Sequence, residues 1–149
     1  MAYTLNYTLI NNDTKYAVSG YTGEPIDVVI PSTYNGKPVV EIADEAFAAS
    51  SIRSVIIPDS VTYIGNASFA ACSNLEKVDL GNGLSSTGVQ VFNSCTLLAS
   101  IVIPESLTSL DHALFASCSK LSNIILLSKT PVTLESDYAF SGIATNAKF

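Results

Sequence analysis

Large apolar side chains return along this chain at a nearly fixed interval. Phenylalanines recur with spacings of 22, 23, 23 and 25 residues, at Phe47, Phe69, Phe92, Phe115 and Phe140. A cysteine follows three residues after each of the middle three, and a leucine follows three residues after each cysteine. A period of roughly 20 to 29 residues is typical of a solenoid, in which each unit buries its apolar face only against its neighbours. We therefore expect one stacked core, with reduced cysteines pointing inward.

Five segments carry apolar residues in a pattern that predicts short parallel strands. These segments are 26–31, 52–58, 75–81, 98–104 and 121–127. In the four later segments the first, fourth and sixth positions are Leu, Ile or Val, and three of the five segments end in proline, whose missing N–H ends a strand. A second short extended piece follows in each unit. The small residues around each phenylalanine predict a compact helical or 3₁₀ turn.

The two ends of the chain differ from the repeats. Residues 3–9 and 16–18 alternate apolar with polar side chains on either side of a turn-forming cluster at 11–14, which predicts a hairpin. We expect an N-terminal β-hairpin cap at 1–24, a solenoid at 25–142 and a tail at 143–149 that forms an incomplete C-terminal cap, all within a single structural domain. The extra residues at 34–37 predict a surface loop.

Composition narrows the classes of protein to which this chain can belong. Its 149 residues suit one domain. The formal net charge of -6, without a basic cluster, leaves nothing to neutralise phosphates, so we expect no nucleic-acid partner. No uninterrupted apolar run approaches the roughly 18 residues of a membrane span, so we expect no membrane insertion. The first ten residues lack the basic and apolar regions of a signal peptide.

Residues that could catalyse a reaction or bind a metal ion are sparse. His112 is the only histidine, and although Cys118 lies six residues further on, the repeat already accounts for that cysteine. Structural zinc sites use closely spaced cysteines, whereas a 23-residue spacing stacks one thiol per unit. The chain contains no GxxxxGK[ST], GxGxxG or HExxH motif. We therefore expect no enzyme activity, no cofactor and no metal site.

The repeated phrases resemble a known family. IPDSVTYIGNASFAACSNL and IPESLTSLDHALFASCSKL are similar to the BspA-like leucine-rich repeat (leucine-rich repeat 5 type), whose units read roughly IPxSVTxIGxxAFxxCxxLxxI. Local departures are Gly81-Asn82-Gly83 in place of the proline segment and Ser50 in place of a cysteine. The resemblance implies an α/β-type, mostly β solenoid: a curved, right-handed array of about five units of 22–25 residues. It also implies an extracellular or cell-surface location and adhesion to host proteins, and some members occur in phage proteins.

The surface available for function is the strand face, where side chains that avoid the core line up from unit to unit. The register places one outward column at Val29, Ile56, Asp79, Val102 and Ile125. The polar border of this column is formed by Arg53, Glu76 and Lys77. Because four of the five column residues are Val or Ile, a partner-binding surface is one interpretation. The other is a sheet face that favours β-branched residues for its own stability, and both stay open.

These observations lead to two functional hypotheses. The first is a non-enzymatic protein-protein interaction or adhesion module whose strand face contacts a protein partner, such as a host or surface protein. The alternative is a structural unit of a larger surface or phage-type assembly, which stacks or self-associates through an open C-terminal rung. A hydrolytic enzyme is a third hypothesis, but no converging set of catalytic residues supports it.

Overall fold

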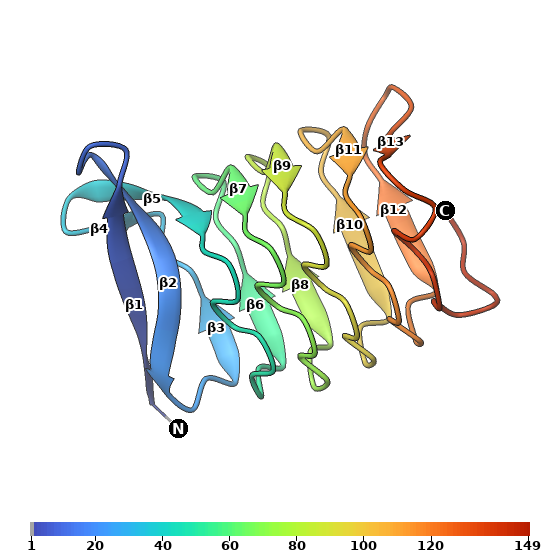
Figure 1. The fold of residues 1–149 in the computed structure, drawn as a ribbon, viewed down its shortest axis with the longest axis horizontal. Coiled ribbons are helices and arrows are strands. Elements are labelled where there is room, and N and C mark those ends of the chain that lie inside the picture. Colours follow the sequence, from blue (N-terminus) through green and yellow to red (C-terminus); the bar gives the residue numbers. More distant parts are fainter. Residues whose placement is uncertain (1) are drawn as a thin grey trace.

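The computed structural model describes residues 2–149 and shows a β-solenoid of about five turns that follows a β-hairpin (Figure 1). Thirteen strands and no helix lie within this range. The strands are β1 (Tyr3–Ile10), β2 (Lys15–Gly23), β3 (Asp27–Val29), β4 (Thr33–Tyr34), β5 (Lys37–Ile42), β6 (Ser54–Ile56), β7 (Tyr63–Ile64), β8 (Lys77–Asp79), β9 (Ser86–Thr87), β10 (Ser100–Ile103), β11 (Ser109–Leu110), β12 (Asn123–Leu126) and β13 (Thr133–Leu134).

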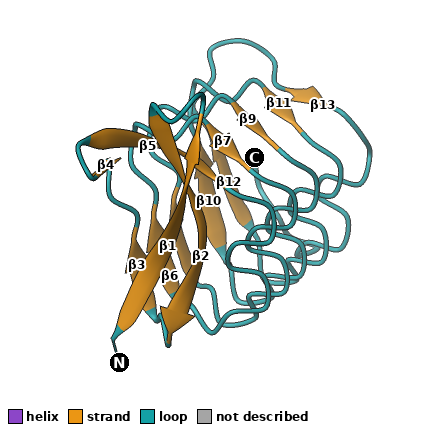
Figure 2. Cartoon of the chain, turned by 60° about the vertical axis from the view of Figure 1, so that its left-hand side comes forward, coloured by secondary structure: helices purple, strands orange, loops and turns teal. Residues whose placement is uncertain are grey.

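Two stacks of short parallel strands form two sides of the solenoid (Figures 1 and 2). On the strand face, β3, β6 and β8 pair in that order, and β10 pairs with β12. On the other side the order is β1-β2-β5-β7-β9, with β4 attached to β5, and β11 pairs separately with β13. The hairpin pair β1–β2 is antiparallel, whereas β2 pairs with β5 in parallel. The five strands of the strand face lie within the five segments that the sequence predicts.

The third side of the solenoid consists of turns, and the expected helical or 3₁₀ turns are not confirmed. Each of the first four turns contains two residues with positive φ four positions apart, such as Glu45 and Ala49, both at 55°, whereas helices require negative φ throughout. Successive backbone N–H groups donate alternately to a carbonyl of the next unit and to a carbonyl of their own unit. Phe47 N–H donates to Ser68 O of the next unit at 2.8 Å, whereas Ala48 N–H donates to Glu45 O within its own unit at 3.1 Å. A helix could not send every second N–H to the next unit, because its N–H groups bond along its own axis.

An aromatic ladder runs through the core, as the sequence predicts. Successive ring centroids are 5.2, 5.4, 5.5 and 5.6 Å apart along Phe47, Phe69, Phe92, Phe115 and Phe140. The first four side chains are buried, whereas the last is only partly buried. Tyr21 of β2 stacks on the first ring at 5.5 Å and closes the N-terminal end of the ladder. The hairpin therefore continues the core of the solenoid.

The three cysteines are free and buried. Each thiol donates a hydrogen bond to a phenylalanine carbonyl of the preceding unit, at 3.0 to 3.2 Å, in the pairs Cys72–Phe47, Cys95–Phe69 and Cys118–Phe92. Ser50 Oγ, in the matching position of the first unit, lies 3.4 Å from Cys72 Sγ. Burial raises the pKa of the Cys72 thiol. The position therefore holds a small side chain with a hydrogen-bonding group, which both residue types provide.

Backbone pairing is interrupted between the third and fourth units. No backbone hydrogen bond joins β8 to β10, or β9 to β11, among residues 2–149. The turns remain joined there, because Phe92 N–H donates to Leu114 O at 2.9 Å. The inward residue of β8, Val78, is only partly buried, whereas Val55 in β6 is buried. The interruption follows the unit in which Thr87 replaces an aliphatic residue, and its hydroxyl is buried without a hydrogen-bond partner in the described chain.

Capping contacts occur at both ends of the strand face. Tyr3 Oη accepts a hydrogen bond from Val29 N–H at 3.2 Å, at the edge of β3. At the other end, Ile124 N–H donates to Lys148 O at 2.9 Å, and Lys148 forms an isolated parallel bridge with Asn123. Within residues 2–149, no strand pairs with the far side of β13. The residues after Phe140 thus cover part of the last unit.

Candidate partner-binding surface

The structure places the expected outward column on the strand face. Register brings Val29, Ile56 and Asp79 side by side, and it brings Val102 beside Ile125. The exposed fractions of the four apolar side chains are 57% for Val29, 48% for Ile56, 44% for Val102 and 42% for Ile125. We call these four residues the apolar stripe. It consists of two adjacent pairs, separated by the unit that carries Asp79.

Burial of the alternate row explains why the stripe faces solvent. The residues that precede the stripe residues in sequence, Val28, Val55, Ile101 and Ile124, are exposed by 2% or less. Successive side chains of a strand point to opposite faces. A shift of the strand register by one residue would turn these four buried residues outward and the stripe inward. Packing of the core therefore fixes which residues face solvent.

Asp79 interrupts the stripe and has a local partner. Its Oδ1 accepts a hydrogen bond from Gly81 N–H at 3.0 Å. Gly81 has a φ of 65°, and a Cβ added there would lie 2.6 Å from Ile57 O. The turn after β8 therefore requires glycine, because a side chain would collide with the neighbouring unit. The carboxylate of Asp79 holds this turn, which gives it a structural role beside any contact with a partner.

The polar border contains a hydrogen-bonded group around Asp27 and two charged side chains, Glu76 and Lys77, outside that group. Asp27 accepts hydrogen bonds from Ser54 Oγ at 2.7 Å and from Arg53 Nη2 at 3.1 Å, and these two bonds lower the pKa of Asp27. Glu76 and Lys77 are exposed, and neither has an ion-pair partner among the described residues. Together the five residues line a depression of about 310 Å³. The three border residues expected from the sequence therefore lie close together.

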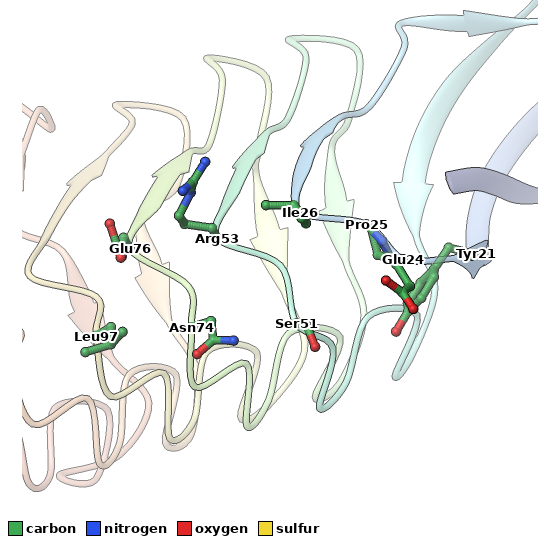
Figure 3. A pocket seen from close by; sticks show the side chains of 10 residues that line it. Tyr21, Glu24, Pro25, Ile26, Ser51, Arg53, Asn74, Glu76 and Leu97 are labelled. Carbon is green, nitrogen blue, oxygen red and sulfur yellow. The ribbon is translucent and has the colours of Figure 1, made fainter. Parts of the chain in front are cut away.

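A larger trough adjoins this depression and shares Arg53 and Glu76 with it, and the apolar residues Tyr21 and Leu97 of its lining were not expected from the sequence. It has a volume of about 500 Å³, and Tyr21, Ile26 and Leu97 contribute to its lining (Figure 3). Leu97 stands where the other units have Ser51 and Asn74, so an apolar residue at a polar repeat position was a usable signal. Nothing in the repeat register indicated Tyr21, which comes from the hairpin.

A further depression lies beside the second half of the stripe. Its volume is about 300 Å³, and Val102 and Leu127 line it. Leu127 is 48% exposed. It occupies the position at which three other units have proline, Pro31, Pro58 and Pro104, and this substitution was the signal that sequence reasoning missed. It extends the exposed apolar surface beyond the stripe.

The side chains that could support other chemistry have local roles. No group of three or more His, Cys, Asp or Glu residues that could hold a metal ion occurs among residues 2–149. His112 Nδ1 lies 3.0 Å from Ser136 Oγ, and the same hydroxyl accepts a hydrogen bond from Tyr138 N–H at 3.2 Å. This arrangement orders a turn of the last unit. In the same range, no helix is long and apolar enough to cross a membrane.

Comparison with known proteins identifies the repeat. The model of the BspA type leucine rich repeat region matches residues 40–148 in 6 copies. The chain belongs to the BspA-type leucine-rich repeat family. The fold is similar to that of a leucine rich repeat protein of T. pallidum, with 33% identity, a TM-score of 0.77, and coverage of 82% of this chain and 61% of that one.

Two further solved structures resemble this BspA-type repeat. One is a leucine rich cell surface protein from Faecalibacterium prausnitzii A2-165, with 26% identity, a TM-score of 0.65, and coverage of 93% of this chain and 45% of that one. The other, from Bacteroides capillosus, shows the fold alone, with 23% identity, a TM-score of 0.55, and coverage of 99% and 91%. The chain thus spans 61% and 45% of the T. pallidum and F. prausnitzii proteins. A search of curated proteins gave no match.

Proposed function

We propose that this BspA-type repeat is a non-enzymatic protein-binding module of the adhesion type, and that the apolar stripe is its contact surface. The observation that carries the proposal is the alignment of four β-branched side chains, each 42% to 57% exposed, on one face. The partner is a protein, such as a host or surface protein. A cell-surface location is part of the proposal, and it is supported by the F. prausnitzii relative, which is described as a cell surface protein.

The size of the stripe suits the apolar centre of an interface. Full burial of a Val or Ile side chain contributes roughly 1.5–3 kcal/mol. Because about half of each side chain is already covered, a partner would gain about 1 kcal/mol at each, or about 4 kcal/mol over the four. A few central apolar residues of this kind carry most of the energy of many interfaces, surrounded by a polar rim. Arg53, Glu76 and Lys77 supply such a rim.

The test is a triple substitution to threonine, at Ile56, Val102 and Ile125. Threonine keeps the β-branch and these side chains point away from the core, so the far-UV circular dichroism spectrum should be unchanged. Crosslinking of the purified wild-type chain to intact cell surfaces identifies a partner, and calorimetry then compares affinities. We expect the triple variant to bind at least about 30-fold more weakly, a loss of about 2 kcal/mol.

A border substitution provides the matched control for this experiment. Lys77→Ala should change the affinity far less than the triple substitution, because rim charges contribute mainly to the rate of association. Unfolding of the triple variant would place the stripe in the core. Unchanged affinity for the crosslinked partner would remove the stripe from the interface.

An alternative function as a structural unit is supported by apolar side chains in the last unit. Leu126, Leu127 and Leu134 are 39%, 48% and 51% exposed, and β13 has an unpaired edge within residues 2–149. A second copy of the chain could cover this surface. Sedimentation equilibrium should then show a dimer that the charged substitutions Leu127→Glu and Leu134→Glu dissociate. A monomeric wild-type chain at all accessible concentrations would exclude self-association through this unit.

A further inference from the structure

The trough at the foot of the strand face is built from two parts of the fold. One wall comes from the end of β2 and the segment after it, including Tyr21 and Glu24 (Figure 3). The floor comes from the residues just before successive strands, where Ile26, Arg53 and Glu76 form one row. Ser51, Asn74 and Leu97 form a second row below them. The trough therefore crosses the units, and its long direction follows the solenoid.

The dimensions suit an extended peptide. The lining residues belong to four successive units, from Ile26 in the first to Leu97 at the start of the fourth. Three steps of roughly 4.8 Å between parallel strands give a length of about 14 Å. An extended chain advances at most about 3.3–3.6 Å per residue, so the trough accommodates about four residues. The volume of about 500 Å³ lies within the range of pockets that bind ligands.

The aromatic wall of the trough is held in place by the core. The Tyr21 ring stacks on Phe47 with a centroid distance of 5.5 Å and an interplanar angle of 9°. Phe47 is itself fully buried. Because the ring is fixed before any partner binds, contact with it costs little conformational entropy. Leu97 supplies an apolar contact in the fourth unit, and the buried Pro25 also belongs to the lining.

The charge of the lining is negative. Glu24 and Glu76 line the trough and are exposed, and neither has an ion-pair partner among residues 2–149. The positive charge of Arg53 is offset by Asp27, which lies 3.1 Å away. Glu24, Glu76 and Arg53 give the lining a formal charge of -1, and Asp27, which does not line the trough, offsets the charge of Arg53. Lys77 borders the neighbouring depression. The trough is thus complementary to a cation set between apolar groups.

We propose that this trough binds an extended segment of a partner protein in which a lysine or arginine is flanked by apolar residues. The cation lies against the carboxylate of Glu24 or that of Glu76, which stand toward opposite ends of the trough (Figure 3), and the apolar side chains lie against Tyr21 and Leu97. This assignment rests on the proposed function as a protein-binding module, but it uses none of the residues of the apolar stripe. It names a class of partner sequence, which the stripe does not.

The test is selection from a displayed peptide library with four randomised positions between flexible Gly-Ser segments. We expect the selected peptides to carry Lys or Arg next to Leu, Ile, Val or an aromatic residue. The double variant Glu24→Gln with Glu76→Gln should bind a selected peptide roughly 3- to 10-fold more weakly, as measured by fluorescence anisotropy. The control variant Asp13→Asn with Glu45→Gln removes the same charge at exposed residues that do not line the trough, and it should bind as the wild type does.

The outcomes separate this proposal from that of the stripe. The triple threonine variant of the stripe should keep its affinity for the selected peptide, because it leaves the lining of the trough unchanged. Binding should also weaken between about 50 mM and about 500 mM NaCl, since exposed charges are screened. Failure to select peptides, selection of acidic or uncharged peptides, or a loss below about twofold in the double variant would overturn the proposal. None of these results would alter the interpretation of the stripe.

Discussion

Replacement of Phe92 by alanine tests the stacked core most directly. Phe92 is 1% exposed, and its ring stacks on Phe69 at 5.4 Å and on Phe115 at 5.5 Å. It therefore has an aromatic neighbour on each side along the ladder. Phe140, at the C-terminal end of the ladder, is only partly buried, stacks on Phe115 at 5.6 Å and meets Phe149 edge-on at 5.2 Å.

The magnitude follows from these surroundings. Truncation of a buried phenylalanine to alanine costs about 3–5 kcal/mol, through lost transfer energy and the cavity that remains. At Phe92 the upper part of this range applies, because hydrogen bonds between turns hold the neighbouring units in place, such as Phe92 N–H to Leu114 O at 2.9 Å. At Phe140 solvent already reaches the side chain, so we expect about 1–3 kcal/mol.

Urea unfolding followed by far-UV circular dichroism measures this difference, since the chain has no tryptophan to report by fluorescence. The comparison of midpoints requires equal m-values in the variants. A third variant, Phe92→Leu, keeps most of the apolar volume but loses the ring stack, and it should cost about 1 kcal/mol. If Phe140→Ala destabilises the chain as much as Phe92→Ala does, the stacked-core interpretation is wrong.

Three further predictions follow from the hydrogen bonds. The amide of Ser100 should exchange with deuterium faster than the amides of Ser54 and Asn123. The latter two donate hydrogen bonds to the preceding unit at 3.2 and 3.3 Å, whereas Ser100 N–H has no such bond. Equal exchange rates would contradict the interrupted pairing. The pKa of Asp27 should rise towards its ordinary value in Arg53→Gln, as measured by NMR titration. Its ionised form stabilises the fold, and this contribution is lost as the pH falls through the lowered pKa. The freshly denatured, unreduced chain should contain three titratable thiols, and the native chain none; fewer than three would indicate a disulfide.

The sequence predicted the parts of the fold that repeat. Spacing alone placed the phenylalanine ladder, the thiols and the five strands, because stacked units impose the same burial on the same position. Period-two alternation also placed the apolar stripe on the outside, since burial of Val55 forces Ile56 outward.

The turns escaped prediction because backbone conformation is not visible in the burial pattern. Small residues suit a tight helix as well as they suit a turn. The positive φ of Ala49 arises from the hydrogen bonds that the turn makes to the next unit, such as Ala49 N–H to Ala70 O at 2.8 Å. The trough escaped prediction for another reason. It depends on where the hairpin lies against the first unit, and that placement is set by the stack of Tyr21 on Phe47.

The interruption between β8 and β10 bears on the two interpretations of the apolar stripe. Cross-strand pairs of β-branched residues contribute roughly 0.2–1 kcal/mol each. If the stripe served only the sheet, its residues would be most useful where backbone pairing fails, yet the third unit carries Asp79 at that position. The apolar pairs Val29–Ile56 and Val102–Ile125 lie instead on neighbouring strands that are already paired through backbone hydrogen bonds.

This distribution favours contact with a partner over stabilisation of the sheet. A partner that covers both pairs must span the third unit, and it would hold the two bonded parts of the solenoid in one relative orientation. Binding would then suppress motion at the junction, and whatever rigidifies the junction would strengthen binding by the same factor. Slower exchange of the Ser100 amide in the complex than in the free chain would show this coupling. Unchanged exchange would mean that the partner rests on one pair alone.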